Sequence, residues 1–285
     1  MKPRSHSLWA ATAFGLSAAT LASQASAQDI GQYVADQGQY IAEAEHQSDW
    51  EFSLGAGVGY VPEYQGSDKY EAVAFPTFEI TWRDAITFSG EGLSATVYER
   101  DSFSFSATLG YGGGREESDS DYLNGLGDIE DGTILALGAE LDLGASVAAT
   151  ADVHKFMDGS KGTVVSLGVQ SAIPLGAGRG LRSSPSQIGM MLIGGLSVDW
   201  ADDDYNQSFF GVSSTQSASS GLRQYTAESG LNSVNAEVGF IKPLGGNWGL
   251  TGMVQYSQLL GDAADSPIVK SKNNYGAVLL VGYSF

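Results

Sequence analysis

Residues 50–60 read WEFSLGAGVGY, and this stretch decides the fold class. From Trp50 to Tyr60 every second residue is apolar or aromatic, while the positions between them hold Glu51, Ser53 and three glycines. A period of two places these two sets on opposite faces of a β-strand. An apolar face with aromatics at its ends, opposite a small and polar face, is typical of a strand that crosses an outer membrane between lipid and a wet lumen.

The same alternation recurs along the chain up to its last residues, where Tyr275, Ala277, Leu279, Val281, Tyr283 and Phe285 share one face. It predicts 12 strands, at residues 50–60, 70–82, 85–90, 92–98, 102–112, 132–143, 145–156, 162–175, 186–200, 231–242, 247–260 and 274–285. Most are long enough to cross, since a tilted transmembrane strand needs about 9–11 residues. The third and fourth are too short and flank a turn at Gly90-Glu91-Gly92, so ten full strands plus a flap is the alternative.

The lengths of the connections sort by side of the membrane. With both termini in the periplasm, the outward connections include the long segments 113–131, 201–230 and 261–273, while the inward ones are short except for 176–185. A soluble β-sandwich has no reason to sort its loops in this way. The sequence therefore predicts a closed antiparallel transmembrane β-barrel over 50–285, with long outer loops and short periplasmic turns.

The first 27 residues have the features of an export signal. Lys2 and Arg4 precede an apolar stretch of about 15 residues, which is short of the roughly 20 that a spanning helix needs. Ala25-Ser26-Ala27 provides small residues for cleavage between Ala27 and Gln28. We expect a polar, glutamine-rich periplasmic leader at 28–49 to follow, and the sequence leaves open whether it stays in the periplasm or enters the lumen. We also expect localisation in the outer membrane of a Gram-negative cell.

Charge and composition exclude several classes of protein. The net charge is −19, and removal of Lys2 and Arg4 with the signal makes it −21, which argues against binding nucleic acid. No apolar run of 18 residues follows the signal, so the sequence predicts no transmembrane helix. The chain has no cysteine, so disulfides do not hold the exported fold together.

The C-terminus carries the most specific single feature. Phe285 ends the chain, with Tyr283 and Val281 at alternating positions before it. An extended edge with pockets for alternate side chains is one way in which proteins recognise a strand. We expect these three residues to form the signal that the barrel-assembly machinery reads.

Little in the sequence indicates catalysis. After the signal only His46 and His154 remain, and we expect His154 to face the lumen as a satisfied pair with Asp152. The acidic stretch from Arg115 to Asp131 could hold a divalent cation, but it lacks the pattern of a calcium loop and is better interpreted as a solvated outer loop. We assign no catalytic residue, no cofactor and no metal site.

Several motifs resemble the MipA/OmpV family of outer-membrane proteins. They include LGAGVGYVPEYQGSD at 54–68, LNGLGDI at 123–129, DWAD at 199–202, FFGVS at 209–213, SGL at 220–222 and DSPIV at 265–269. The resemblance covers nearly the whole of 54–285 and leaves the leader outside it. It implies a non-enzymatic scaffold that brings a lytic transglycosylase together with a penicillin-binding protein; other members are implicated in adhesion.

Alternatives from other classes remain open on the sequence. A small-solute pore that prefers cations is the second reading, because a barrel of this size can hold a narrow lumen and this one would be acidic. An adhesin and a hydrolase of the lumen or outer face are less favoured. If the protein is a scaffold, its partner-facing turn is expected at 176–185, where Arg179 and Arg182 stand out, while the wall contacts lipid and lipopolysaccharide.

Overall fold

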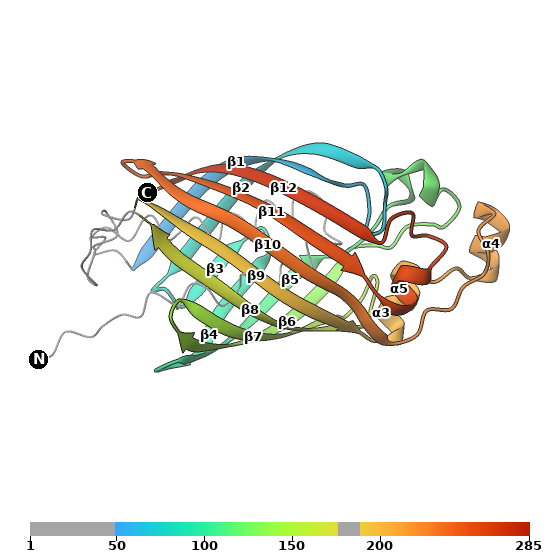
Figure 1. Cartoon of the computed structure of the whole chain (residues 1–285), viewed down its shortest axis with the longest axis horizontal. Helices are drawn as coiled ribbons and strands as arrows, with labels where there is room; N and C mark the ends of the chain where they lie inside the picture. The colour runs from blue at the N-terminus through green and yellow to red at the C-terminus, as the bar shows by residue number, and fades with distance from the viewer. Residues whose placement is uncertain (1–48, 176–188) are drawn as a thin grey trace, which may run out of the picture.

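A computed structural model describes residues 49–175 and 189–285, which form a closed antiparallel β-barrel (Figure 1). Each strand pairs with the next one along the chain, and the last pairs with the first. The strands are β1 (Trp50–Pro62), β2 (Tyr70–Trp82), β3 (Ile86–Ser89), β4 (Gly92–Arg100), β5 (Phe103–Gly112), β6 (Gly132–Gly144), β7 (Val147–Phe156), β8 (Thr163–Leu175), β9 (Met190–Ala201), β10 (Gly230–Gly245), β11 (Trp248–Leu259) and β12 (Asn273–Ser284). The predicted fold class is confirmed, and the strand bounds differ from the predicted ones by a few residues.

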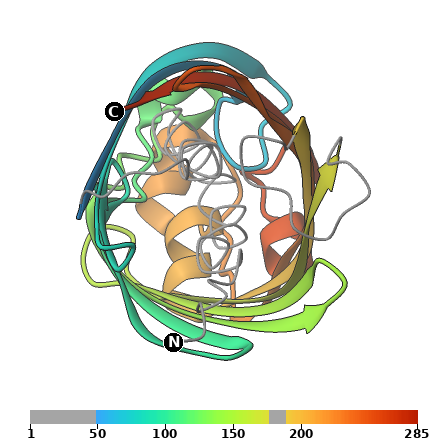
Figure 2. The same ribbon diagram turned by 90° about the vertical axis from the view of Figure 1, so that its left-hand side faces the viewer.

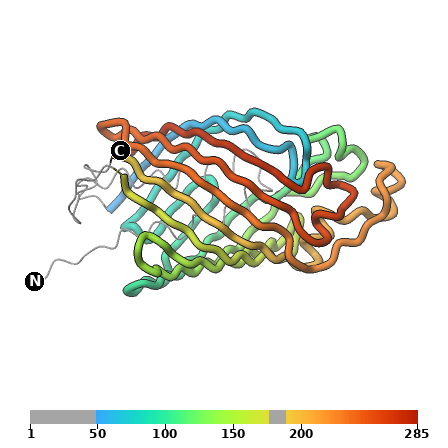
Figure 3. Tube along the Cα trace, in the orientation of Figure 1, coloured from blue at the N-terminus to red at the C-terminus, as the bar shows by residue number. Residues whose placement is uncertain are grey.

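The alternation in sequence becomes an outer and an inner face of the wall. Leu54, Val58 and Leu196 are each more than half exposed on the outside, where lipid would cover them, while Gly57 and Ser197 are buried on the inside. The Cα trace shows the strands tilted against the long axis of the barrel (Figure 3). Tilt of this kind is what closure of a sheet into a barrel requires.

Aromatic pairs mark both ends of the outer face. Near the chain termini the ring centroids of Trp50 and Trp82 lie 6.2 Å apart, and those of Trp248 and Tyr283 5.0 Å apart. At the opposite end the rings of Tyr60 and Tyr70 are 5.4 Å apart, and those of Tyr256 and Tyr275 5.2 Å apart. Two such girdles are expected where a barrel meets the two membrane interfaces.

The hairpin of β3 and β4 covers only part of the height of the wall. β3 pairs with β2 only over Glu79–Trp82, so the stretch 70–78 of β2 has β1 as its one strand partner within the described chain. Pro76 lies in this singly paired stretch, where a residue without a backbone N–H is tolerated. The hairpin belongs to the closed strand order, so the count is twelve and the alternative of ten strands plus a flap is wrong.

The connections sort as predicted. The described turns at the end that carries the C-terminus are tight, and Asp101, Ala145 and Gly246 adopt positive φ angles in them. The other end carries long connections with short helices: η2 (Glu117–Asp119), η3 (Asp121–Leu123), α3 (Asp203–Phe210), α4 (Ser214–Ser220) and α5 (Gly261–Asp265). None of the helices within the described ranges is long and apolar enough to cross a membrane. The helical end is therefore the outer end.

Candidate functional site: the capped lumen

The four large outer connections, 63–69, 113–131, 202–229 and 260–272, pack together into a unit that we call the cap. One buried apolar cluster in it joins all four, through Tyr64, Leu123, Leu126, Val212 and Ile268. Viewed from the periplasmic end, the cap helices lie inside the ring of strands, across the far mouth (Figure 2). The cap thus covers the outer end of the lumen.

A second apolar cluster fixes the cap to the wall. The ring centroids of Tyr205 and Phe209 on α3 lie 4.8 Å apart, and the Tyr205 ring lies 5.3 Å from that of Phe156 on β7. Tyr205 is completely buried. Asp202 starts α3, because its side chain accepts a hydrogen bond from the N–H of Tyr205. The α3 helix is therefore seated against the inner wall.

Hydrogen bonds to backbone carbonyls tie the connections to one another. The Tyr64 hydroxyl donates to the carbonyl of Ile268 at 3.1 Å, and the Arg115 guanidinium donates to that of Phe209 at 2.8 Å. Burial lowers the pKa of Arg115 to about 10, and burial raises the pKa of Tyr64 well above its usual value. Nothing in the sequence of this acidic loop indicates that Arg115 is buried and joins two connections.

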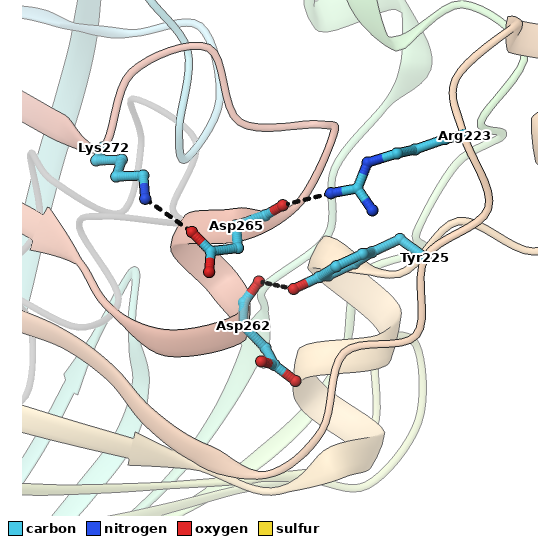
Figure 4. A network of polar contacts seen from close by, with 5 residues as sticks. All are labelled: Arg223, Tyr225, Asp262, Asp265 and Lys272. Carbon is cyan, nitrogen blue, oxygen red and sulfur yellow. Dashed lines mark hydrogen bonds and ion pairs between the residues drawn. The ribbon is translucent and has the colours of Figure 1, made fainter.

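An exposed set of contacts connects α5 with the segment after α4 (Figure 4). The Asp265 carboxylate accepts from Lys272 at 2.8 Å, and its backbone carbonyl accepts from Arg223 at 2.9 Å. The Tyr225 hydroxyl donates to the carbonyl of Asp262 at 2.8 Å. The hydrogen bond from Lys272 lowers the pKa of Asp265. Such exposed pairs add little to stability, so the apolar clusters hold the cap together.

The acidic stretch 115–131 lies in the cap, and its carboxylates bind the loop's own backbone. Glu117 Oε2 accepts from the N–H groups of Gly125 and Gly127, each at 3.0 Å. Asp128 Oδ1 accepts from the N–H of Glu117 at 2.8 Å. Within residues 49–175 and 189–285, no three His, Cys, Asp or Glu side chains are grouped as a metal site would need. The acids therefore shape the loop.

Below the cap, buried carboxylates line the inner wall: Glu79, Glu140, Asp152 and Asp199. Asp199 is fully buried and accepts from Ser166 at 2.7 Å, from Ser233 at 2.7 Å and from Asn235 at 2.6 Å. Among the buried residues of the described strands there is no Lys or Arg. The lumen is therefore acidic, which is the condition for preferring cations.

Asp199 differs in its surroundings from the acids that follow it in the sequence. Asp203 and Asp204 are exposed in the first turn of α3, whereas Asp199 is buried in β9. The alternation along β9 indicates that Asp199 belongs to the wall, because it lies on the inner face together with Ser197 and Ile193. An acid in phase with lumen residues belongs to the wall and not to the loop.

His154 faces the lumen as predicted, with Val153 on the outer face. Its side chain is buried, and neither ring nitrogen has a hydrogen-bond partner among the described residues. The expected pair with Asp152 is wrong, because residues two apart on a strand are roughly 7 Å apart. Its cross-strand neighbours are the apolar Ala136 and Val164. Among residues 49–175 and 189–285, no side chain accepts a hydrogen bond from His154 that would orient it as a general base.

The predicted assembly signal lies at the barrel seam. Tyr283 pairs with Leu54 and Val281 pairs with Ala56, which joins β12 to β1. The Tyr283 ring packs against Phe285 at 4.9 Å between centroids. The cleavage site at Ala27 and Gln28, the leader up to residue 48, and the candidate turn with Arg179 and Arg182 lie outside the described residues.

Comparison with known proteins places these features in context. The family model described as "MltA-interacting protein MipA" matches residues 54–285. The MltA-interacting protein of Escherichia coli K12 is 31% identical over 84 residues, which cover 28% of this chain and 32% of that protein. Outer membrane protein Omp26La of Vibrio anguillarum is 27% identical over 151 residues, 53% of each chain. The chain thus spans between a third and about half of the curated relatives that it matches.

Comparison with solved structures finds matches at low sequence identity. LpxR from Salmonella typhimurium gives a TM-score of 0.46 at 12% identity, covering 81% of this chain and 99% of that one. The KdgM porin gives a TM-score of 0.39 at 7% identity, covering 82% and 99%. Identities this low say nothing about a shared activity.

Proposed function

Because this chain belongs to the MipA family of MltA-interacting proteins and is an outer-membrane barrel, we propose that it is a non-enzymatic adaptor for murein-remodelling enzymes in the periplasm. A lytic transglycosylase is the first partner to expect, and a penicillin-binding protein is the second. The name of the Escherichia coli relative, MltA-interacting protein, supports an interacting role, and the match covers about a third of that relative.

The observation that carries the proposal is the cap. It covers the outer mouth with two buried apolar clusters, so the large folded loops of this protein are committed to packing on one another. A partner in the periplasm must then bind the opposite end. Most connections there are tight turns, such as those at Asp101 and Ala145, which offer little surface.

The turn at 176–185 is the candidate docking segment. It is longer than the other inward connections and carries Arg179 and Arg182 in a protein of strongly negative charge. Arginine is enriched at interfaces because its planar guanidinium makes directed hydrogen bonds and stacks on other groups. The competing role for these two cations is contact with anionic lipid headgroups.

A binding experiment with purified proteins tests the adaptor function. Immobilised wild-type barrel should retain a purified lytic transglycosylase, and the double variant Arg179→Ala, Arg182→Ala should retain much less. The matched control is Arg83→Ala, Arg100→Ala, which removes two arginines from other turns at the same end, where each contacts a neighbouring aspartate. Equal retention by both variants would place the contact elsewhere, and no retention by wild type would refute the adaptor function.

A second candidate is a pore that prefers cations, and the acidic inner wall favours it. Purified barrel in a planar bilayer under a KCl gradient should then conduct, with a reversal potential that shows preference for K⁺ over Cl⁻. A barrel that does not conduct would remove this candidate and leave the adaptor function untouched. For the isolated His154 we propose no catalytic role.

A further inference from the structure

Four exposed cations of the cap gather on one side of the outer end, and we call them the basic rim: Lys69, Arg223, Lys270 and Lys272. The chain holds 14 Lys and Arg against 33 Asp and Glu, so a group of four cations is not expected from composition. In the described ranges, the other exposed cations of the outer end are Lys155 and Lys161, near β7 and β8 and about half way round the order of strands from β1. The basic rim is therefore confined to one side of the barrel.

Backbone hydrogen bonds tie together the two segments that carry the three lysines. The carbonyl of Gly66 accepts from the N–H groups of Lys270 and Ser271, at 2.7 and 2.9 Å. The buried side chain of Asn274 donates to the carbonyl of Ser67 at 2.9 Å and accepts from the N–H of Gly66 at 2.8 Å. The two segments therefore form one platform, and the lysines project from it into solvent.

Two cations of the basic rim lie over aromatic rings. Lys270 Nζ is 4.4 Å from the centroid of the Tyr122 ring, and the guanidinium carbon of Arg223 is 4.9 Å from that of the Tyr225 ring. A cation over a ring face is attracted to it without forming an ion pair. In the described chain no salt bridge involves Lys69 or Lys270. Their charges are therefore available to an anion from outside.

Asp265 brings the other two cations together. Its carboxylate accepts from Lys272 and its backbone carbonyl accepts from Arg223, so the two cations lie on either side of it (Figure 4). Asp265 offsets part of their charge but uses only one donor of each. An ammonium group has three N–H donors and a guanidinium group has five. The remaining donors can bond to further oxygen atoms.

The basic rim lies directly above the outer aromatic girdle. Lys69 immediately precedes Tyr70, whose hydroxyl accepts from the N–H of Tyr275 at 3.2 Å. Aromatic side chains of barrels lie at the level of the lipid headgroups. Basic residues at this level attract anionic headgroups. Below the girdle the wall is apolar and exposed on the same strands, at Val58 and Leu279.

We propose that the basic rim binds the phosphate groups of a lipid of the outer leaflet, whose acyl chains lie on the apolar wall beneath. Phosphate oxygens accept several charge-assisted hydrogen bonds at once, and the planar guanidinium of Arg223 matches their geometry. The cations are continuous with the surface that faces the membrane, which favours a lipid over a soluble anion. The site lies at the opposite end from the proposed docking turn, so it stands or falls separately from the adaptor function.

Binding of purified lipid A to the pure barrel tests the proposal. Native mass spectrometry in detergent compares lipid A that carries two phosphates with the same lipid after both phosphates have been removed. Wild-type barrel should bind the phosphorylated form about tenfold more tightly, because only this form carries anions for the basic rim. Equal affinity for the two forms would overturn the proposal.

Two variants of equal charge locate the site. The test variant removes the basic rim and consists of Lys69→Gln, Arg223→Gln, Lys270→Gln and Lys272→Gln. The control removes four exposed cations from other places and consists of Arg100→Gln, Lys155→Gln, Lys161→Gln and Lys242→Gln. The test variant should bind phosphorylated lipid A about tenfold more weakly than wild type, and the control less than about twofold. Equal losses would show that only net charge matters and would overturn the proposal.

A smaller variant separates binding from folding. Lys69→Gln, Lys270→Gln leaves both hydrogen bonds at Asp265 in place, and we expect it to bind about threefold more weakly. The same two positions changed by Lys69→Arg, Lys270→Arg should bind as wild type does, and heat-modifiable migration shows that each variant is folded. A folded glutamine variant that binds as wild type does would overturn the role of these lysines.

A competitor without acyl chains tests whether the ligand is a lipid. Inositol hexaphosphate carries more phosphate groups than lipid A but has nothing to lay on the apolar wall. We expect it to displace little lipid A at equal concentration, since it lacks the apolar contacts. Complete displacement would show that the basic rim takes soluble polyanions, and the assignment to a lipid of the outer leaflet would be wrong.

Discussion

The backbone N–H of Phe285 donates to the carbonyl oxygen of Phe52 at 2.8 Å, so the last residue of the chain extends the pairing between β12 and β1. This is the seam at which the barrel closes. The residue predicted to be recognised during assembly is thus also part of the closed wall.

We expect deletion of Phe285 to lower the yield of folded barrel in cells several-fold, because the assembly machinery loses the aromatic end of the strand that it would pair with. The variant Phe285→Trp, which keeps an aromatic side chain and the backbone hydrogen bond, is the control and should assemble nearly as well as wild type. The measurement is the fraction of outer-membrane protein whose migration on gels changes on heating. If the deletion leaves that fraction unchanged, Phe285 has no role in recognition.

Asp199→Ala should destabilise the barrel by about 3 kcal/mol, because three buried donors lose a charged acceptor at once. The donors are Ser166, Ser233 and Asn235, which reach Asp199 from β8 and β10. Asp203→Ala removes an exposed acid four residues away and should cost less than about 0.5 kcal/mol. Urea unfolding followed by tryptophan fluorescence compares the two, and equal midpoints would show that the Asp199 network does not stabilise the fold.

The sequence predicts the strands of the barrel wall better than the contacts of the side chains inside the barrel and the cap, for a physical reason. The period of two is imposed by lipid on one side and the lumen on the other, so it can be read from each strand by itself, as at Trp50–Pro62. The burial of Arg115, by contrast, depends on Phe209, which is distant in sequence and reaches it only when the outer connections fold together. The unpaired His154 has the same origin, because its neighbours Ala136 and Val164 come from other strands.

Alkaline pH should loosen the cap through Tyr64. The unfolded phenol has its ordinary pKa near 10, and burial raises the pKa in the folded protein. The stabilisation of the folded protein that a raised pKa brings is complete below about pH 10. It is lost as the pH rises toward the pKa that Tyr64 has in the folded protein. Arg115 changes the stability of the folded protein in the opposite direction over this pH range, because its pKa in the folded protein is lowered to about 10.

The comparison with Tyr64→Phe isolates the tyrosine. The variant loses the hydrogen bond to the carbonyl of Ile268, which should cost about 1 kcal/mol at neutral pH, and its stability should fall less steeply above pH 10. Protease cleavage within the cap, measured from pH 8 to about pH 11 on folded barrel, reports the opening. A parallel loss in wild type and variant would assign the alkaline effect to other groups.

Gly92→Ala should disrupt the short hairpin of β3 and β4. Gly92 has a φ of +124°, and an added Cβ would lie 2.1 Å from the carbonyl oxygen of Leu109 on β5. Neither the backbone nor the neighbouring strand can relieve such a contact cheaply, so we expect a loss of about 3 kcal/mol or more in the free energy of unfolding. Gly144→Ala is the control, because Gly144 also has a positive φ, of +81°, but no atom within 4 Å of the added Cβ. It should cost about 1 kcal/mol.

Hydrogen exchange shows where the Gly92→Ala variant opens. Because β3 pairs with β2 only over Glu79–Trp82, exchange should rise first in β2 and β3. Equal exchange in all strands would mean that the hairpin is not the weak part of the wall.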